Sequence, residues 1–296
     1  MGTAFLSTTA LHPLFGVEVH DIDLRDVSVD HGFHEIRHLF DEHSLLLFRG
    51  QSLGDDAHLR FGALWGTIED RSMGMSMGAA PGTPARMDNV SNRLDDGTIA
   101  GADNLHTIDL MGNQLWHTDS TFLPVPALAN ILAARVLSST GGETEFTSTR
   151  VALAEMPEHL REVAQRAVFR HRLAHSRRDL SPELVERHLA RWPDQTWRAV
   201  WRNPSNGLDA LYIASHAMCI EGMDLDEGQR LIIEMLEFCT ARERVYSHSW
   251  QPGDVLVWDE RATLHRGRPW PYHEERTLAS ICISASDADG LDSVRP

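Results

Sequence analysis

Lysine is absent from this sequence of 296 residues, so all 27 side chains with a fixed positive charge are arginines. Any anion-binding site must therefore use arginine, histidine or backbone amides. Acidic residues number 43, which gives a formal net charge of −16. Binding to a phosphate backbone requires a basic protein surface, so this charge argues against a nucleic-acid partner.

Cysteines and long apolar runs are also scarce. The three cysteines, Cys219, Cys239 and Cys282, have no CxxC spacing, which predicts buried thiols in a reducing compartment. The N-terminus lacks a basic region followed by an apolar core, and no apolar run approaches membrane-spanning length. We therefore expect a cytoplasmic protein without a membrane partner. A hydrophobic fraction of 42% can fill the core of one large domain over residues 1–296.

The apolar periodicity predicts a mainly β protein with decorating helices. Amphipathic patterns predict helices over residues 31–42, 55–65, 157–166 and 181–191, and one from Asp224 as N-cap to Cys239. Short β-prone runs occur at residues 44–48, 129–137, 143–148, 199–201, 211–213, 255–258 and 278–283. Many short strands with helices around them indicate a double-sheet jelly roll, also called a double-stranded β-helix.

The segment from about residue 70 to 112 has a different composition. It is rich in glycine, methionine, asparagine and aspartate, contains Pro81 and Pro84, and shows little periodicity. A long irregular stretch inside a compact domain is usually functional or disordered. Because it directly precedes His117-Thr118-Asp119, we interpret it as an active-site lid inserted into the domain rather than a linker.

His117-Thr118-Asp119, taken with the remote His265, is the principal chemical motif. A His-x-Asp pair plus a distant histidine is the ligand set that holds non-haem Fe(II) on one face and leaves the other face open. On an extended strand, residues two apart point to the same side, and His265 would complete the set from another strand. One such pair could arise by chance among 17 histidines and 43 acidic residues. All three ligands together favour the metal site.

Arg276 lies eleven residues after His265 and directly before the β-prone run 277–283. A planar guanidinium can bind a carboxylate through two charge-assisted hydrogen bonds, so Arg276 is a candidate for binding an acidic cosubstrate. The alternative is a surface salt bridge with Glu274 or Glu275.

These residues resemble those of the Fe(II)- and 2-oxoglutarate-dependent dioxygenases of the taurine and 2,4-dichlorophenoxyacetate group, and most of all the aryloxyacetate-cleaving herbicide dioxygenases. The resemblance runs nearly end to end and includes Leu11–Phe15, Asp21–Arg25, Leu47–Gln51, Asn113–Ser120, Gly141–Phe146, Trp258–Asp259 and Leu264–Arg268. It implies a homo-oligomer that uses Fe(II), 2-oxoglutarate and O2.

The resemblance also implies a reaction. The far carboxylate of 2-oxoglutarate would meet Arg276 and the hydroxyl of Thr144, although Thr144 could simply be a β-prone residue after a Gly-Gly turn. Oxidation of 2-oxoglutarate to succinate and CO2 would be coupled to hydroxylation beside the ether oxygen of an aryloxyalkanoate-type acid, which yields a phenol and a 2-oxo acid. The alternative is the same chemistry on an alkyl sulfonate, a sulfate ester or another small organic acid.

Binding of the substrate's acid group is where the sequence departs from the family. Several members place a second arginine four residues beyond the cosubstrate arginine, and Ser280 stands there. The lysines that herbicide-cleaving relatives carry in their lid are absent too. Asn113 matches a family position that lines the substrate pocket, although a buried asparagine can equally serve the backbone. The candidates to replace the missing cations are Arg71, Arg86 and Arg93 in the segment 70–112, and His216, where relatives also carry a histidine.

Two other classes compete with this interpretation. A jelly-roll binding protein without catalysis would have no need for the full ligand set and Arg276. A zinc hydrolase would need a general base beside three metal ligands, and no candidate base is evident in the sequence.

Overall fold

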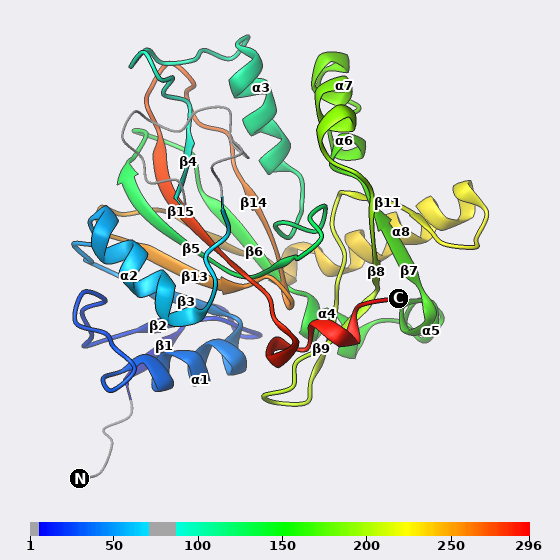
Figure 1. Ribbon diagram of the computed structural model, residues 1–296, viewed down its shortest axis with the longest axis horizontal. Coiled ribbons are helices and arrows are strands. Elements are labelled where there is room, and N and C mark those ends of the chain that lie inside the picture. The colour runs from blue at the N-terminus through cyan, green and yellow to red at the C-terminus, as the bar shows by residue number, and fades with distance from the viewer. Residues whose placement is uncertain (1–5, 71–86) are drawn as a thin grey trace.

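Two β-sheets facing each other form the centre of the molecule in the computed structural model (Figure 1). The structure describes residues 6–70 and 87–296. Within these ranges the larger sheet has the order β1 (Thr8–Ala10), β2 (Val17–Val19), β3 (Leu45–Phe48), β13 (Val255–Asp259), β5 (Ala127–Val136), β15 (Thr277–Ser284) and β4 (Asp88–Ser91). The smaller sheet has the order β12 (Tyr246–His248), β6 (Thr144–Ser148) and β14 (Thr263–Gly267).

The alternation of side chains along each strand divides the core in two. In β3, Leu45 and Leu47 pack with Phe146 of the smaller sheet, whereas Leu46 and Phe48 belong to a second cluster on the other face. The ring of Phe146 lies 5.3 Å from that of Trp258 on β13, so the two sheets pack face to face. The predicted jelly roll is therefore confirmed.

Helices cover the outer faces of both sheets. Phe40 of α1 (Phe33–His43) and Trp65 of α2 (Asp55–Trp65) pack with their rings 4.8 Å apart in the cluster outside the larger sheet. The cluster outside the smaller sheet joins Leu264 of β14 to Leu231 of α8 (Leu225–Cys239). It also includes residues of α4 (Thr149–Glu155), α5 (Glu158–Arg166), β7 (Val168–His171) and β11 (Ala217–Ile220).

The remaining elements are short. A third sheet has the order β11, β7 and β8 (Gln195–Arg198), and β9 (Val200–Arg202) pairs with β10 (Asp209–Leu211). Figure 1 shows α3 (Leu105–Met111) beside α6 (Leu173–Ser176) and α7 (Pro182–Arg191) at one end of the molecule. The 3-10 turns are η1 (Gly112–Gln114), η2 (Arg242–Arg244), η3 (Asp287–Asp289) and η4 (Leu291–Ser293).

All five predicted helices are present, with ends within two residues of the predicted ones. The expectation of an irregular segment over residues 70–112 is wrong for its second half. β4 pairs with β15 at the edge of the larger sheet, and α3 follows, capped by the Asn104 side chain. Residues 71–86 of the predicted lid lie outside the described residues. Among the described residues, no helix is long and apolar enough to cross a membrane.

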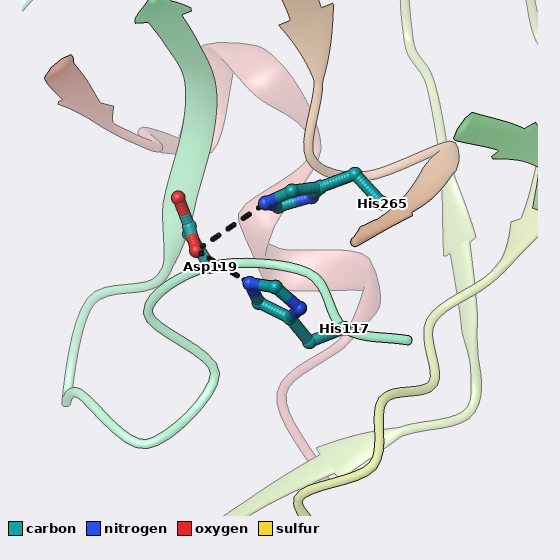
Figure 2. Close-up of side chains that lie close together, drawn as sticks. All are labelled: His117, Asp119 and His265. Carbon is teal, nitrogen blue, oxygen red and sulfur yellow. Dashed lines mark ion pairs between the residues drawn. The ribbon is translucent and has the colours of Figure 1, made fainter. Parts of the chain in front are cut away.

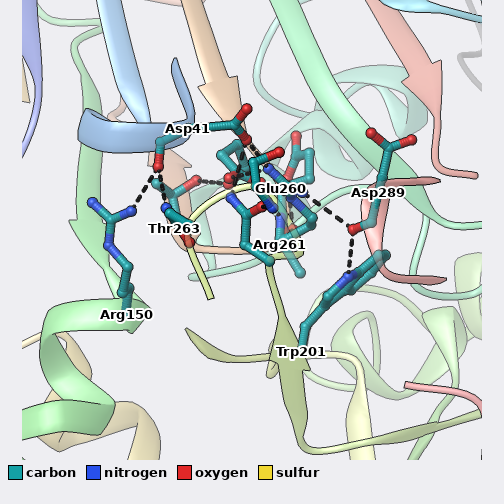
Figure 3. A network of polar contacts seen from close by, with 12 residues as sticks. Asp41, Arg150, Trp201, Glu260, Arg261, Thr263 and Asp289 are labelled. Carbon is teal, nitrogen blue, oxygen red and sulfur yellow. Dashed lines mark hydrogen bonds and ion pairs between the residues drawn. The ribbon is translucent and has the colours of Figure 1, made fainter. Parts of the chain in front are cut away.

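A buried ionic network fixes the turn between β13 and β14 (Figure 3). Arg261 is 2% exposed and donates to both carboxylate oxygens of Asp259 at 2.8 and 2.9 Å and to Asp41 of α1 at 2.8 Å. A further bond reaches the carbonyl of Asp289 at 3.1 Å. The network therefore ties α1 and the C-terminal segment to a turn that ends three residues before His265.

Candidate active site

His117, Asp119 and His265 converge at the inner face of the jelly roll (Figure 2). The Oδ1 atom of Asp119 lies 3.6 Å from Nε2 of His117 and 3.7 Å from Nε2 of His265. One ligand atom from each residue lies within 4.8 Å of the others. Two imidazole nitrogens and one carboxylate at this spacing form a facial ligand set for a divalent metal.

A backbone pairing brings the two histidines together. The amide of His117 donates to the carbonyl of His265 at 3.0 Å, and the amide of His265 donates back at 2.8 Å. His117 is thus an isolated bridge beside β14, and the expectation that His117 and Asp119 share a regular strand is wrong. Asp119 lies in a turn in which Ser120 has a positive φ of 60°. The carboxylate reaches the histidines from that turn.

Both histidines are prepared to act as neutral ligands. Nδ1 of His117 lies 2.7 Å from the carbonyl of Leu115 and donates to it, which leaves the Nε2 lone pair facing Asp119. Burial lowers the pKa of His117, and it lowers the pKa of His265 to about 3. Neutral imidazole is the form that binds a metal, so the donor set fits a divalent iron ion.

The second oxygen of Asp119 is held by side chains of the larger sheet. Asn130 on β5 donates to Oδ2 of Asp119 at 2.7 Å, and Ser280 on β15 donates to Oδ1 of Asn130 at 2.9 Å. Cys282, the strand partner of Asn130, also has its sulfur 3.5 Å from this oxygen. The remaining oxygen, Oδ1, therefore faces the histidines. Ser280 lies in the site, where its hydroxyl orients Asn130.

Glu260 contacts the segments that carry the candidate metal ligands, and the sequence analysis did not identify it. Its Oε2 accepts hydrogen bonds from the hydroxyl of Thr118 at 2.6 Å and from the amide of Asp119 at 2.9 Å, and lies 3.9 Å from Nδ1 of His265. Burial and the nearby Asp119 charge raise the pKa of Glu260 well above its usual range. The available signal was the run of charged residues, Asp259 to Arg261, directly after an apolar strand.

Arg276 is 4% exposed and has its guanidinium turned inward. Nη2 donates to the carbonyl of Gly142 at 2.6 Å, and Cζ lies 5.1 Å from the Trp270 ring centre. Burial lowers the pKa of Arg276 to about 10, so the side chain stays charged at neutral pH. The alternative salt bridge is not formed, because Glu275 pairs with Arg93 and Glu274 with Ser139.

One cavity joins Arg276 and the metal group. Thr144 lines this cavity and accepts a bond from the Trp250 indole at 3.0 Å, so its own hydroxyl proton is available to a ligand. The cavity lining also includes Val90, His106, Asp109, Leu110, Asn113, Phe122, Leu173, Arg177, His188, His216 and Ser280.

The predicted substrate residues do not all reach this cavity. Asn113, His216 and Ser280 line it, and Nδ1 of His216 lies 3.0 Å from the hydroxyl of Thr121. Arg93 is not among the lining residues; its side chain is 47% exposed and pairs with Glu275 at 3.0 Å. The candidates Arg71 and Arg86 lie outside the described residues.

Comparison with known proteins agrees with this geometry. Residues 7–282 match the family model described as taurine catabolism dioxygenase TauD, TfdA family. The chain is 35% identical to the α-ketoglutarate-dependent 2,4-dichlorophenoxyacetate dioxygenase of Cupriavidus pinatubonensis, over 90% of this chain and 94% of the relative. It is 31% identical to the (S)-phenoxypropionate/α-ketoglutarate dioxygenase of Delftia acidovorans, over 92% and 93%. The crystal structure of AAD-2 in complex with Mn(II) and N-oxalylglycine superposes with a TM-score of 0.85 at 29% identity, covering 95% of this chain and 98% of that one.

The chain therefore belongs to the TauD/TfdA family of dioxygenases. It is a 2-oxoglutarate-dependent non-haem iron enzyme, and its cofactor and cosubstrates are Fe(II), 2-oxoglutarate and O2.

Proposed function

We propose that this enzyme hydroxylates the carbon next to the ether oxygen of an aryloxyalkanoate-type acid. The observation that carries the proposal is a single cavity that joins the His-Asp-His group to Arg276 and adds an apolar wall of Phe122, Leu110 and Leu173. Such a wall suits an aromatic ring beside the metal. The names of the relatives from Cupriavidus and Delftia support the same substrate class.

In this proposal His117, Asp119 and His265 hold Fe(II), and Arg276 with Thr144 binds the far carboxylate of 2-oxoglutarate. Bound Fe(II) would supply the oxidising chemistry, in which 2-oxoglutarate and O2 are converted with the substrate to succinate, CO2 and the hydroxylated product. Asn130 keeps one Asp119 oxygen turned away, so the other is presented together with the two imidazoles. The hydroxylated product is a hemiacetal; its C–O bond breaks as the hydroxyl proton passes to the leaving oxygen, giving a phenol and a 2-oxo acid.

The test is succinate release with Fe(II) and 2-oxoglutarate across aryloxyacetates, 2-aryloxypropionates, aryl acetates and alkyl sulfonates, with phenol measured in the same samples. The proposal expects succinate matched by phenol for an aryloxy acid. Succinate coupled only to a sulfonate or sulfate ester would refute it and select the alternative substrate class. His117→Ala and Asp119→Ala serve as controls that retain the fold and lose turnover.

The arrangement of the chain fits this role. We infer that residues 1–296 form one dioxygenase domain in which the described residues 87–112 of the inserted segment close one side of the cavity. In its described part, β4 and α3 contribute Val90, His106 and Asp109 to the lining. The homo-oligomeric state and the cytoplasmic location stay predictions.

A further inference from the structure

Arg177 is a second buried arginine in this cavity, and none of the roles above uses it. It directly follows α6, and its side chain is 8% exposed. It shares the cavity wall with His216, one of the substrate candidates, and with the apolar residues Phe122 and Leu173. A buried cation needs a partner or a function, because its removal from water is costly.

The surrounding residues fix the position of this guanidinium. Nε donates to Oδ1 of Asp109 on α3 at 3.0 Å, and Nη1 donates to the hydroxyl of Ser176 at 2.9 Å. Nε2 of His188 on α7 lies 3.2 Å from the same Asp109 oxygen. Arg177 thus lies where α3, α6 and α7 meet.

Gly112, at the end of α3, lets the guanidinium lie against the backbone. A Cβ atom at this position would lie 2.1 Å from Cζ of Arg177, so every other residue type would displace the side chain. The hydrogen bonds to described residues use two of the five N–H donors of Arg177. These two bonds hold the guanidinium in place while its other N–H donors stay available for a ligand, which lowers the entropic cost of binding an anion.

The described cavity lining contains two arginines, and the reaction has two acids to bind, 2-oxoglutarate and the organic-acid substrate. The arginines in that lining are Arg177 and Arg276, and the proposed function assigns Arg276 to 2-oxoglutarate. Ser280 stands at the position where several family members carry a second arginine, and its hydroxyl donates a hydrogen bond to Asn130. We propose that Arg177 binds the carboxylate of the organic-acid substrate, with the aromatic part against Phe122 and Leu173. This inference rests on the proposed function and names the residue that selects an acid.

Asp109 does not cancel this site. Its Oδ1 atom accepts the bond from Nε of Arg177 and also lies within hydrogen-bond distance of Nε2 of His188. The remaining N–H donors of the guanidinium belong to Nη1 and Nη2. An arginine with carboxylates on two edges is a common arrangement, because its donors form a fixed fork with more than one bidentate face.

The experiment compares Arg177→Gln with the wild type on two substrates, the acid that best stimulates succinate release and its neutral primary amide. The wild type should prefer the acid. Arg177→Gln should raise the KM for the acid by about 10- to 100-fold, the loss expected for a charged hydrogen-bonding partner, and leave the KM for the amide and for 2-oxoglutarate nearly unchanged. Arg178→Gln, which changes the adjacent exposed arginine, should behave as wild type.

An equal rise in KM for acid and amide would overturn the inference, because a merely structural role predicts that result. If Arg177→Gln is not recovered folded, Arg177→Lys provides the same comparison: it keeps a charge but loses the fork, so only the KM for the acid should rise. Failure of the proposed function is recognised separately, as absence of phenol from the wild type. In that case the comparison of acid and amide uses whichever sulfonate or carboxylate the wild type oxidises. If the wild type prefers no acid over its amide, the Arg177 assignment is overturned.

Discussion

Replacing Gly142 with alanine should weaken 2-oxoglutarate binding, although Gly142 itself contributes no side chain. Gly142 has a φ of +74°, and its carbonyl accepts the bond from Nη2 of Arg276. An added Cβ would lie 2.6 Å from Nε and 2.9 Å from Cδ of Arg276. Ordinary contact begins near 3.4 Å, so the arginine side chain would have to move by 3.4 − 2.6 = 0.8 Å. It is 4% exposed and packed against Trp270, which leaves little room to do so.

Two effects of different kind follow from this substitution. The left-handed backbone costs an L-residue about 1–2 kcal/mol of folding free energy. The displaced guanidinium loses one charge-assisted bond to the cosubstrate, worth about 1.5–3 kcal/mol, so the half-saturating 2-oxoglutarate concentration should rise by about 10- to 100-fold. Gly222→Ala is the matched control: Gly222 has a φ of +76° and nothing within 4 Å of the added Cβ. It should show the stability loss alone.

The measurement combines urea unfolding of both variants with a 2-oxoglutarate titration of succinate release at saturating Fe(II). A loss of stability in both variants, at least as large in Gly142→Ala, with a raised half-saturating concentration in Gly142→Ala only, would support the assignment of Arg276. If Gly142→Ala and Gly222→Ala shared the wild-type half-saturating concentration, Arg276 would not bind the cosubstrate, and the proposed role of Thr144 beside it would lose its basis too.

Three further predictions concern the surroundings of the site. Glu260→Ala should lower the affinity for Fe(II) by about 10- to 100-fold, measured as iron retained on dialysis, because the loop of metal ligands loses its acceptor. Arg261→Ala should cost about 3–5 kcal/mol in urea unfolding, since it leaves buried carboxylates unpaired, whereas exposed Arg25→Ala should leave stability near wild type. Burial lowers the pKa of His58 to about 3, below the 6.5 of the unfolded chain, so stability is lost as pH falls below 6.5. His58→Gln should remove about 2 kcal/mol of that loss between pH 7 and 5 in the apoenzyme, and an unchanged pH profile would contradict the burial argument.

The sequence predicted the metal group because its chemistry is concentrated in a short motif. His117 and Asp119 are two residues apart in sequence, and His265 follows a recognisable strand. The geometry behind this correct prediction differed from the expected one, since a bridge to His265 and a turn at Asp119, rather than one regular strand, bring the ligands together. Periodicity likewise located the helices, whose apolar faces repeat locally, and it missed short strands such as β4 that depend on a partner strand.

Residues that act through tertiary contacts carried no such local signal. Arg177 lies 60 residues beyond His117 in sequence and enters the cavity only because α6 and α7 fold beside α3. Glu260 looked like one more charged residue after a strand, and its position depends on Arg261 binding the distant Asp41. Such contacts join segments far apart in sequence, so one sequence without a structure could not reveal them.

Ser280 on β15 and Arg177 at the junction of α3, α6 and α7 lie on two walls of the cavity, and the residue at position 280 decides which wall can bind the substrate acid. An arginine at position 280 would point inward from β15, at a place where the serine side chain is 3% exposed and its hydroxyl orients Asn130 against Asp119. A larger side chain there would have to give up this bond, and with it part of the support for the metal ligand. A substrate carboxylate must then be bound from another wall, and the junction of α3, α6 and α7 provides Arg177, which Asp109 and Gly112 already fix in place. Introducing Ser280→Arg into Arg177→Gln should therefore fail to restore the low KM for the acid. Full recovery would show instead that the acid can be bound from β15 and that the position of the cation is not fixed by the support of Asp119.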